Sequence, residues 1–326
     1  MNRLSTVVAI AAACASVTGC ATTTPAPTTK TMPALITPTE ARAKLAKISE
    51  NKVQLWVVVH VRGHKTLKED GTVDEQKLID TAVANADAVV TGGGDMIILI
   101  NSRTEMPLYE RVITAVRQKY PKYPLGISAL NYGPINLTEG FRLAKQFDAQ
   151  MVWCENVPDE KIEYEDDDGS YKPADVIPLK LALETQQSLK PDAIHTAGVH
   201  MKYTRPLDGK TFEQAMEAAL GKVDGINITG PKTAVLADIE LVKTARRIAK
   251  DYVLGLASGV STENIGSVVD FIDYAIVGTS LKYENDPLRT DPEKVKALRA
   301  KMTELGDGAS REAKWRAPHD RAEGAQ

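Results

Sequence analysis

Short apolar runs alternate with longer amphipathic segments from residue 55 to residue 305. The apolar runs have the length of buried strands, and each precedes a segment with the periodicity of a helix that buries one face. The expected strands are 55–61, 95–101, 125–130, 151–156, 193–201, 225–229, 253–257 and 274–278. The expected helices are 74–90, 108–119, 136–147, 175–189, 211–220, 236–250, 262–270 and 292–305. Eight strand–helix units predict an α/β fold, a (β/α)8 TIM barrel made by a single domain over 37–306, with an open doubly wound sheet as the alternative.

Local signals support several of these helix boundaries. Thr37, Pro38 and Glu40 form the start of a capping box with proline in the first turn, which predicts an additional helix to about residue 50. We expect this helix to close the floor or the side of the barrel. Thr211 with Gln214 predicts a second capping box at the start of the expected helix 211–220.

The last two expected strands each stop at a small, glycine-containing loop. In a β/α barrel such loops, together with a nearby helix N-terminus, commonly bind phosphate through backbone N–H groups. We therefore expect an anion to be held by the segments 258–261 and 278–280. The candidate residues are Ser258, Gly259, Ser261, Gly278, Thr279 and Ser280.

The first 36 residues have the pattern of an export signal and a tether. Arg3 precedes a short apolar core at 7–15, and Val-Thr-Gly-Cys at 17–20 resembles a bacterial lipobox. The apolar run is too short to span a bilayer, and an ordinary N-terminal helix is the alternative. We expect a signal peptide at 1–20, a lipid on Cys20, a Thr/Pro-rich tether at 21–36 and a disordered tail at 307–326. This pattern predicts an exported lipoprotein on the periplasmic face of the cell membrane or the outer membrane.

Charge and cysteine content narrow the possible partners. The 326-residue chain has a formal net charge of −3, which gives no general attraction to nucleic acid. Once Cys20 carries a lipid, Cys154 has no disulfide partner and reads as a small core residue. Carboxylates are scarce at the expected strand ends, so we expect no metal and no cofactor. The acidic run 163–168 reads as a solvated loop, with a divalent cation site as the alternative.

Polar side chains at the carboxyl end of the fifth strand are the main catalytic candidates. Alternation places His200 and Lys202 on the face that looks into the barrel mouth. His200 is expected to act as a general acid or base, with a structural histidine as the alternative. Lys202 is expected to bind an anion, form a Schiff base or remain a solvated rim lysine.

Other strand ends supply further ligand-binding candidates by the same alternation. His60 and Arg62 share one face, with an ordinary rim ion pair as the alternative. Cys154 and Asn156 share a face in the fourth strand, which gives Glu155 outward parity. The candidates added by this argument are His60, Asn101, Asn156, Thr229 and Gly230.

The motifs at these strand ends resemble those of the BtpA/SgcQ family. The specific matches are SGVSTENI at 258–265, AIVGTSLK at 275–282, VHMKYTRPL at 199–207 and ITG at 228–230. The segments 59–60 and 92–95 match more loosely. The resemblance implies a barrel related to phosphate-binding barrels. It also implies membership of a family whose founding cyanobacterial member is linked to photosystem I biogenesis. Other members are encoded in sugar-metabolism operons.

Two positions depart from the family pattern. Gly198 stands where family members usually carry Asp, and Tyr132-Gly133 stands where they usually carry an Asn-Asp pair. Both changes remove carboxylates from the expected site. The leading hypothesis is a metal-independent isomerase or lyase of a small phosphorylated, sugar- or nucleotide-like ligand, in which His200 moves protons and Lys202 stabilises charge. The alternative is a non-catalytic, membrane-anchored binding or assembly factor with an unspecified protein partner, and a metal-dependent hydrolase comes third.

Overall fold

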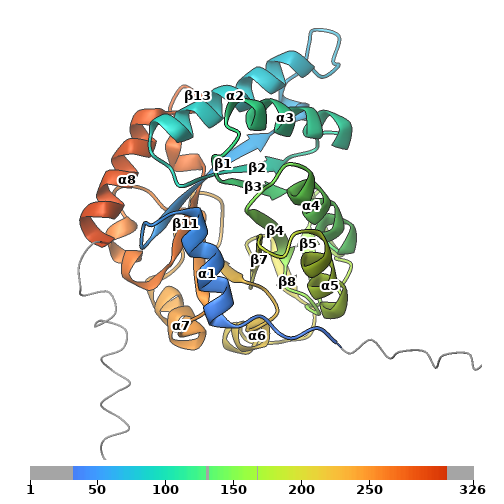
Figure 1. The fold of residues 1–326 in the computed structure, drawn as a ribbon, viewed down its shortest axis with the longest axis vertical. Coiled ribbons are helices and arrows are strands. Elements are labelled where there is room, and N and C mark those ends of the chain that lie inside the picture. The colour runs from blue at the N-terminus through green and yellow to red at the C-terminus, as the bar shows by residue number, and fades with distance from the viewer. Residues whose placement is uncertain (1–31, 130–131, 167, 307–326) are drawn as a thin grey trace, which may run out of the picture. The chain divides into compact units, whose positions relative to one another are not determined.

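Eight parallel strands close into a barrel in the computed structural model, which describes residues 32–129, 132–166 and 168–306 (Figure 1). The strands follow the ring order β1-β11-β10-β9-β7-β4-β3-β2. Their bounds are β1 Gln54–Val61, β2 Met96–Asn101, β3 Leu125–Ser128, β4 Met151–Asn156, β7 Ile194–Gly198, β9 Gly225–Thr229, β10 Val253–Ala257 and β11 Tyr274–Val277. The predicted TIM barrel is confirmed, and the open sheet is wrong because β1 pairs with both β2 and β11.

The α-helices surround the barrel and follow the predicted order with one exception. Their bounds are α1 Pro38–Ile48, α2 Glu75–Thr91, α3 Met106–Lys119, α4 Pro134–Gln146, α5 Leu179–Leu189, α6 Phe212–Ala219, α7 Ile239–Ala249 and α8 Pro292–Gly306. The helix predicted at 262–270 is wrong, because this segment forms only the 3-10 turns Ile265–Ser267 and Val269–Phe271. Gly266 and the β-branched Val268 and Val269 disfavour an α-helix there.

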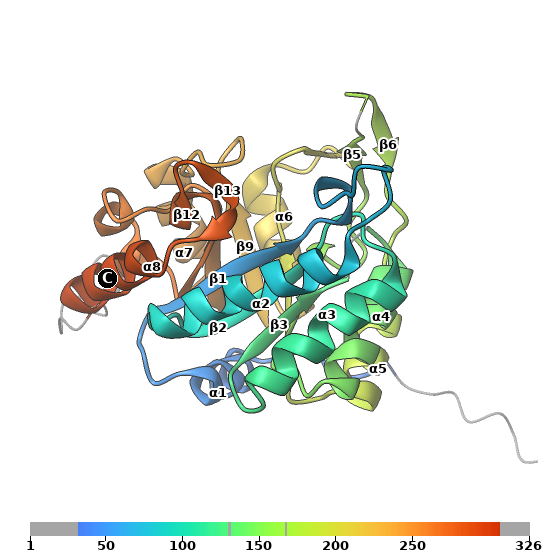
Figure 2. The same cartoon turned by 90° about the horizontal axis from the view of Figure 1, so that it is seen from above.

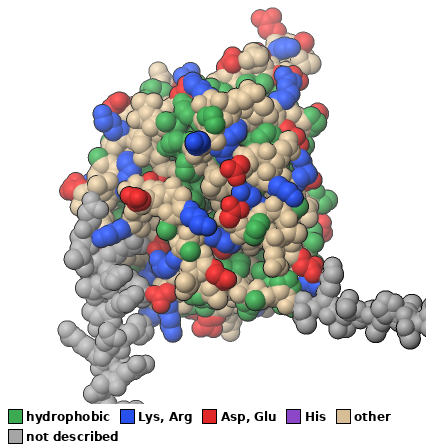
Figure 3. Space-filling model, viewed as in Figure 1, with side chains coloured by type: hydrophobic (Ala, Val, Ile, Leu, Met, Phe, Trp, Pro, Cys, Tyr) green, Lys and Arg blue, Asp and Glu red, His purple; other side chains and the backbone are tan. Residues whose placement is uncertain are grey.

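Helix α1 closes the N-terminal end of the barrel, as expected from its start signals. Thr37 and Glu40 form the predicted capping box, and Thr211 forms the other one with Gln214. Leu45 and Ile48 join the apolar cluster that fills the barrel. The face on which α1 lies shows acidic, basic and apolar side chains intermixed (Figure 3). This end of the barrel therefore carries no single-sign patch.

The interior of the barrel is filled by an aromatic stack. The rings of Trp56 and Tyr274 lie 3.7 Å apart with an interplanar angle of 13°. The Tyr274 hydroxyl donates to Asn227 Oδ1 over 2.6 Å. Space for the Tyr274 ring comes from Gly225 and Gly255, where an added Cβ would lie 2.7 Å and 2.1 Å from its atoms. The barrel is thus a packed core, and ligands have room only at its ends.

Buried aspartates link neighbouring strands at the N-terminal end of the barrel. Each one accepts a hydrogen bond from a backbone N–H on the adjacent strand and pairs with a cation from a helix. The bonds are Asp95 to Leu55 N (2.6 Å) and Arg299 (2.9 Å), Asp224 to His195 N (2.8 Å) and Lys44 (2.8 Å), and Asp273 to Leu254 N (2.9 Å) and Arg246 (2.6 Å). These contacts stabilise the end of the barrel opposite the strand carboxyl termini.

Two small sheets flank the C-terminal end of the barrel (Figure 2). One is the hairpin of β12 Lys282–Tyr283 and β13 Asp286–Thr290. The other combines β5 Ile162–Glu165, β6 Tyr171–Pro173 and β8 Thr204–Pro206. The acidic run 163–168, expected as a solvated loop, therefore starts in a strand.

No described helix is long and apolar enough to cross a membrane. Cys20, the tether up to residue 31 and the tail 307–326 lie outside the described residues.

Candidate functional site

The mouth at the carboxyl ends of the strands is lined by side chains that continue the interior face of the barrel. In β1 the interior positions are Trp56 and Val58, whereas Leu55, Val57 and Val59 pack outward against the helices. His60 continues the interior face, as predicted. Burial lowers the pKa of His60 to about 3, and the positive charges of Arg62, Lys282 and Lys202 lower it further. His60 is therefore a neutral imidazole at physiological pH.

Glu155 lies on the interior face, so its predicted outward parity is wrong. Met151 and Trp153 fill the barrel, while Cys154 belongs to the outer layer. The ladder to β7 shifts register between Cys154 and Asn156, which leaves Glu155 at the top of the interior face. Burial raises the pKa of Glu155, and Lys202 opposes this rise. Met151, Trp153 and Glu155 stand two residues apart, so the two large apolar side chains were the sequence signal that could have placed Glu155 on the interior face.

Lys202 crosses the mouth from the loop after β7. Its Nζ donates to Thr233 Oγ1 and to Ser258 Oγ, both over 3.3 Å. Its backbone N–H donates to Thr229 Oγ1 over 2.9 Å, which fixes the lysine to the end of β9. Burial lowers the pKa of Lys202, and the Glu155 carboxylate raises it. Lys202 and Glu155 thus influence each other's pKa through their opposite charges, and burial removes both groups from water.

Arg62 and Lys282 supply further positive charge next to His60. Lys282 Nζ donates to Thr290 Oγ1 over 2.8 Å, and the Thr290 N–H donates to Asn85 Oδ1 of α2 over 2.6 Å. Burial lowers the pKa of Lys282 to about 8, with a further reduction by Arg62. Burial also lowers the pKa of Arg62. The ion pairs found among the described residues include neither of these cations nor Lys202.

His200 does not join Lys202 in the mouth, so the predicted shared direction is wrong. Strand β7 ends at Gly198, and His200 has a left-handed backbone with φ 45°. Its ring packs edge-on against Phe212 of α6 with centroids 5.9 Å apart. Asp208 and Glu213 are the carboxylates that act on its pKa, which burial lowers. Met201 takes the interior position instead.

The glycine loops after β10 and β11 are partly occupied by the protein's own bonds. Ser258 N donates to Ile276 O over 3.2 Å, and Ser261 N donates to Asn264 Oδ1 over 2.8 Å. Two of the amides expected to hold an anion are therefore already engaged. Atoms of Val235 and Leu236 also lie over the loop, because an added Cβ on Gly259 would be 2.2 Å from them.

Some of the remaining predicted residues support these loops, and Gly278 lies beside the mouth. Ser280 Oγ donates to Val260 O over 2.6 Å and ties the two loops together. Gly230 lies under the same loop as Gly259, with an added Cβ 2.0 Å from Val235 O. Thr279 is exposed. Gly278 lies beside the imidazole, since its added Cβ would be 3.8 Å from His60 Cε1.

The two predicted asparagines are buried outside the charged mouth. Asn101 donates to Thr104 O over 3.0 Å and accepts from Thr104 N over 2.9 Å, so it braces the loop before α3. Asn156 is fully buried, and its side-chain atoms have no hydrogen-bond partner. Among the described residues, neither asparagine forms a hydrogen bond with Arg62, Lys202 or Lys282.

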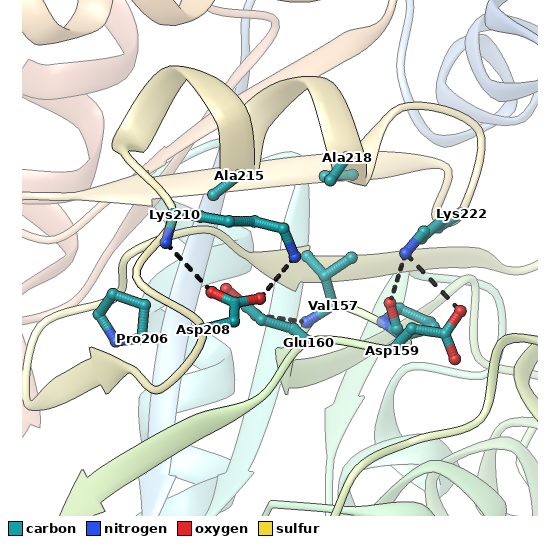
Figure 4. A pocket seen from close by; sticks show the side chains of 11 residues that line it. Val157, Asp159, Glu160, Pro206, Asp208, Lys210, Ala215, Ala218 and Lys222 are labelled. Atoms are coloured by element: carbon teal, nitrogen blue, oxygen red, sulfur yellow. Dashed lines mark hydrogen bonds and ion pairs between the residues drawn. The ribbon is translucent and has the colours of Figure 1, made fainter.

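Two hollows lie near the mouth. A groove of about 470 Å³ runs between the starts of α3 and α4. Its lining residues are Asn101, Arg103, Thr104, Met106, Ala129, Tyr132, Ile135, Asn136 and Glu139. A smaller hollow of about 20 Å³ lies beside α6, bordered by the Lys210–Asp208 pair at 2.5 Å and the Lys222–Asp159 pair at 3.7 Å (Figure 4). The smaller one has room for about one water molecule.

Metal-binding geometry is absent from the described residues. In residues 32–129, 132–166 and 168–306, no three His, Cys, Asp or Glu side chains are grouped so that they could hold a metal ion.

Comparison with known proteins identifies the family. The photosystem I biogenesis protein BtpA from Synechocystis sp. is 30% identical over 125 residues, a match that covers 37% of this chain and 44% of that protein. This chain thus aligns with less than half the length of that relative. Among solved structures, tryptophan synthase from Mycobacterium tuberculosis matches with a TM-score of 0.52 at 12% identity, covering 83% of this chain and 97% of that chain.

Thiamine phosphate pyrophosphorylase from Pyrococcus furiosus matches with a TM-score of 0.49 at 15% identity, covering 78% of this chain and 98% of that chain. At these identities the structural likeness concerns the fold alone. The sequence profile of the BtpA family matches residues 52–304, which spans the whole barrel. The chain therefore belongs to the BtpA family.

Proposed function

We propose that this BtpA-family barrel binds a small anionic ligand, a phosphorylated sugar-like or nucleotide-like compound, in its C-terminal mouth. The observation that carries the proposal is that the positive charges of Arg62, Lys202 and Lys282 all act on the buried His60, while none of the three has an ion-pair partner among the described residues. The loop 278–280 lies beside the same imidazole. Membrane attachment through Cys20 remains a proposal from the sequence.

The energetic reason is desolvation. Burial lowers the pKa of all three cations, which means that the folded protein disfavours their charged forms. A bound phosphate offsets this cost by pairing with them and by accepting their hydrogen bonds. A mouth built in this way favours an anion with more than one negative charge.

We assign the proposed catalysis to Glu155 and Lys202. Burial raises the pKa of the Glu155 carboxyl and lowers the pKa of the Lys202 ammonium, and each of these directions favours proton transfer near neutral pH. We propose that Glu155 moves the proton and Lys202 stabilises developing negative charge, as in a metal-independent isomerase or lyase. His200 is a weaker candidate for this role, because its ring lies against Phe212.

A non-catalytic binding or assembly role is the second candidate. The relative from Synechocystis sp. is named for photosystem I biogenesis, and this chain carries Gly198 and Tyr132-Gly133 at the expected carboxylate positions. Anion binding without turnover of any phosphorylated compound would favour this second role.

The Arg62→Ala variant tests the anion site. We expect its affinity for inorganic phosphate, measured by isothermal titration calorimetry, to fall roughly tenfold to a hundredfold, because a hydrogen bond to a charged group contributes about 1.5–3 kcal/mol. The matched control is Lys47→Ala, which removes an exposed positive charge from α1 at the opposite end of the barrel. Equal affinities in the Arg62→Ala variant and the unmodified protein would refute the proposed site.

Phosphate binding should also weaken as pH rises through about 8. Lys282 has a folded pKa of about 8 because burial lowers it, so its ammonium is present below that pH and lost above it. The phosphate group of a monoester such as ribose 5-phosphate becomes doubly charged above about pH 6, so the strongest binding of that ligand is expected between these two values. Titrations from pH 6 to pH 10 measure the profile, and the Lys282→Met variant should flatten its alkaline limb. An unchanged alkaline limb in that variant would exclude Lys282 as the titrating group.

A further inference from the structure

The groove between the starts of α3 and α4 has no part in the anion site described above. It encloses about 470 Å³, within the range of roughly 300–1,000 Å³ that is common for small-molecule pockets. Apolar surface comes from Met106, Ala129, Tyr132 and Ile135, and the Ile135 side chain is 76% exposed. Arg103 and Glu139 also line the groove and carry opposite charges. The groove therefore suits an uncharged portion of a ligand rather than a second anion.

Tyr132 lines this groove and is the lining residue that interacts electrostatically with Glu155 of the mouth. Its ring stacks on Tyr164 of β5, with centroids 4.5 Å apart and an interplanar angle of 16°. Burial raises its pKa, and the negative charge of Glu155 in the mouth adds to that rise. Strand β5 is itself held by pairing with β8, including Tyr164 with Thr204. The stacking on Tyr164 therefore holds the Tyr132 ring in place at the edge of the site.

The other side of the groove adjoins Arg62. Thr104, which lines the groove, accepts a hydrogen bond from Gly63 N over 3.0 Å. Its own hydroxyl donates to Val61 O over 3.0 Å. Arg62 lies between these two bonded residues in the chain. A ligand that reaches from the Arg62 side to Tyr132 would therefore span the mouth and the groove.

We propose, on the basis of the anion-binding function above, that the groove holds a planar ring of the same ligand. The ring lies against Tyr132 while the phosphate contacts Arg62 and Lys282. Aromatic stacking accepts any flat ring and adds affinity without hydrogen-bond readout. The ligand class is then a phosphate monoester bearing an uncharged planar ring, such as a nucleoside monophosphate, in preference to an open-chain sugar phosphate.

The test compares inorganic phosphate, ribose 5-phosphate, phenyl phosphate and adenosine 5′-monophosphate by isothermal titration calorimetry on the full chain. We expect at least one of the two ring-bearing esters, phenyl phosphate or adenosine 5′-monophosphate, to bind about tenfold more tightly than inorganic phosphate, as stacking on an aromatic side chain predicts. The Tyr132→Leu variant should lose that gain and keep its affinity for inorganic phosphate. An Ile135→Ser variant, changed at an exposed position, should reduce the gain and change the stability of the fold by no more than about 0.5 kcal/mol.

Tyr171→Leu is the matched control, because the Tyr171 ring packs on the Arg205 guanidinium at 3.5 Å and does not line the groove. This variant should bind all four compounds like the unmodified protein. If phosphate binds in an Arg62-dependent way but the ring-bearing esters gain nothing, the groove inference is overturned and the anion site stands. If none of the four compounds binds, the proposed function itself fails.

Discussion

Replacing Asp273 by alanine is expected to lower the free energy of unfolding by about 3–5 kcal/mol, the usual effect of removing one partner of a buried ion pair. Asp273 and Arg246 are both 3% exposed at their side chains, and their charged atoms lie 2.6 Å apart. The same carboxylate accepts the Leu254 N–H over 2.9 Å. The alanine variant leaves a buried guanidinium without its carboxylate and a buried N–H without its acceptor. Urea denaturation followed by circular dichroism measures the loss.

The control for this substitution is Asp238→Ala, which removes an exposed N-cap of α7 and is expected to cost only about 1 kcal/mol. A second comparison adds Arg246→Met to Asp273→Ala. The double variant should be more stable than the sum of the two single losses predicts, because a buried pair replaced by apolar groups is often tolerated. Strictly additive losses would show that the pair does not act as a unit.

Gly255→Ala is the second large expected effect, a loss of about 2–3 kcal/mol from overpacking of the barrel interior. Gly255 has an ordinary strand conformation, so the cost is steric. An added Cβ would lie 2.1 Å from Tyr274 Cε2 and 2.7 Å from Asn227 Oδ1. The Tyr274 ring cannot shift freely, because it stacks on Trp56. Thermal and urea unfolding of the purified variant measure the change.

Gly266→Ala is the matched control for the same substitution. An added Cβ at Gly266 meets only Leu305 Cδ1, at an ordinary 3.5 Å. We expect that variant to differ from the unmodified protein by no more than about 0.5 kcal/mol. Similar losses in both variants would mean that the glycines matter for backbone freedom rather than for the space they leave to Tyr274.

Much of the fold follows from the sequence because its signals are local. Alternating apolar runs and amphipathic segments gave all eight barrel strands, and side chains three residues apart gave the capping boxes at Thr37 and Thr211. The predicted helix at 262–270 failed, since its apolar periodicity did not overcome Gly266 and the short span before Tyr274. Periodicity reports which residues are buried and says less about which backbone buries them.

The direction of side chains past the strand ends was decided by the tertiary structure. Alternation holds only while the chain stays extended, and it fails at His200, where φ is 45°. It also placed Glu155 on the wrong face, because which parity faces the barrel depends on where Met151 and Trp153 find space among the other strands. Lys282 enters the site only because a hairpin bonded to α2 holds it there. By itself, then, the sequence determined the barrel. The residues that meet at its mouth come from segments far apart in the chain, and only long-range packing brings them together.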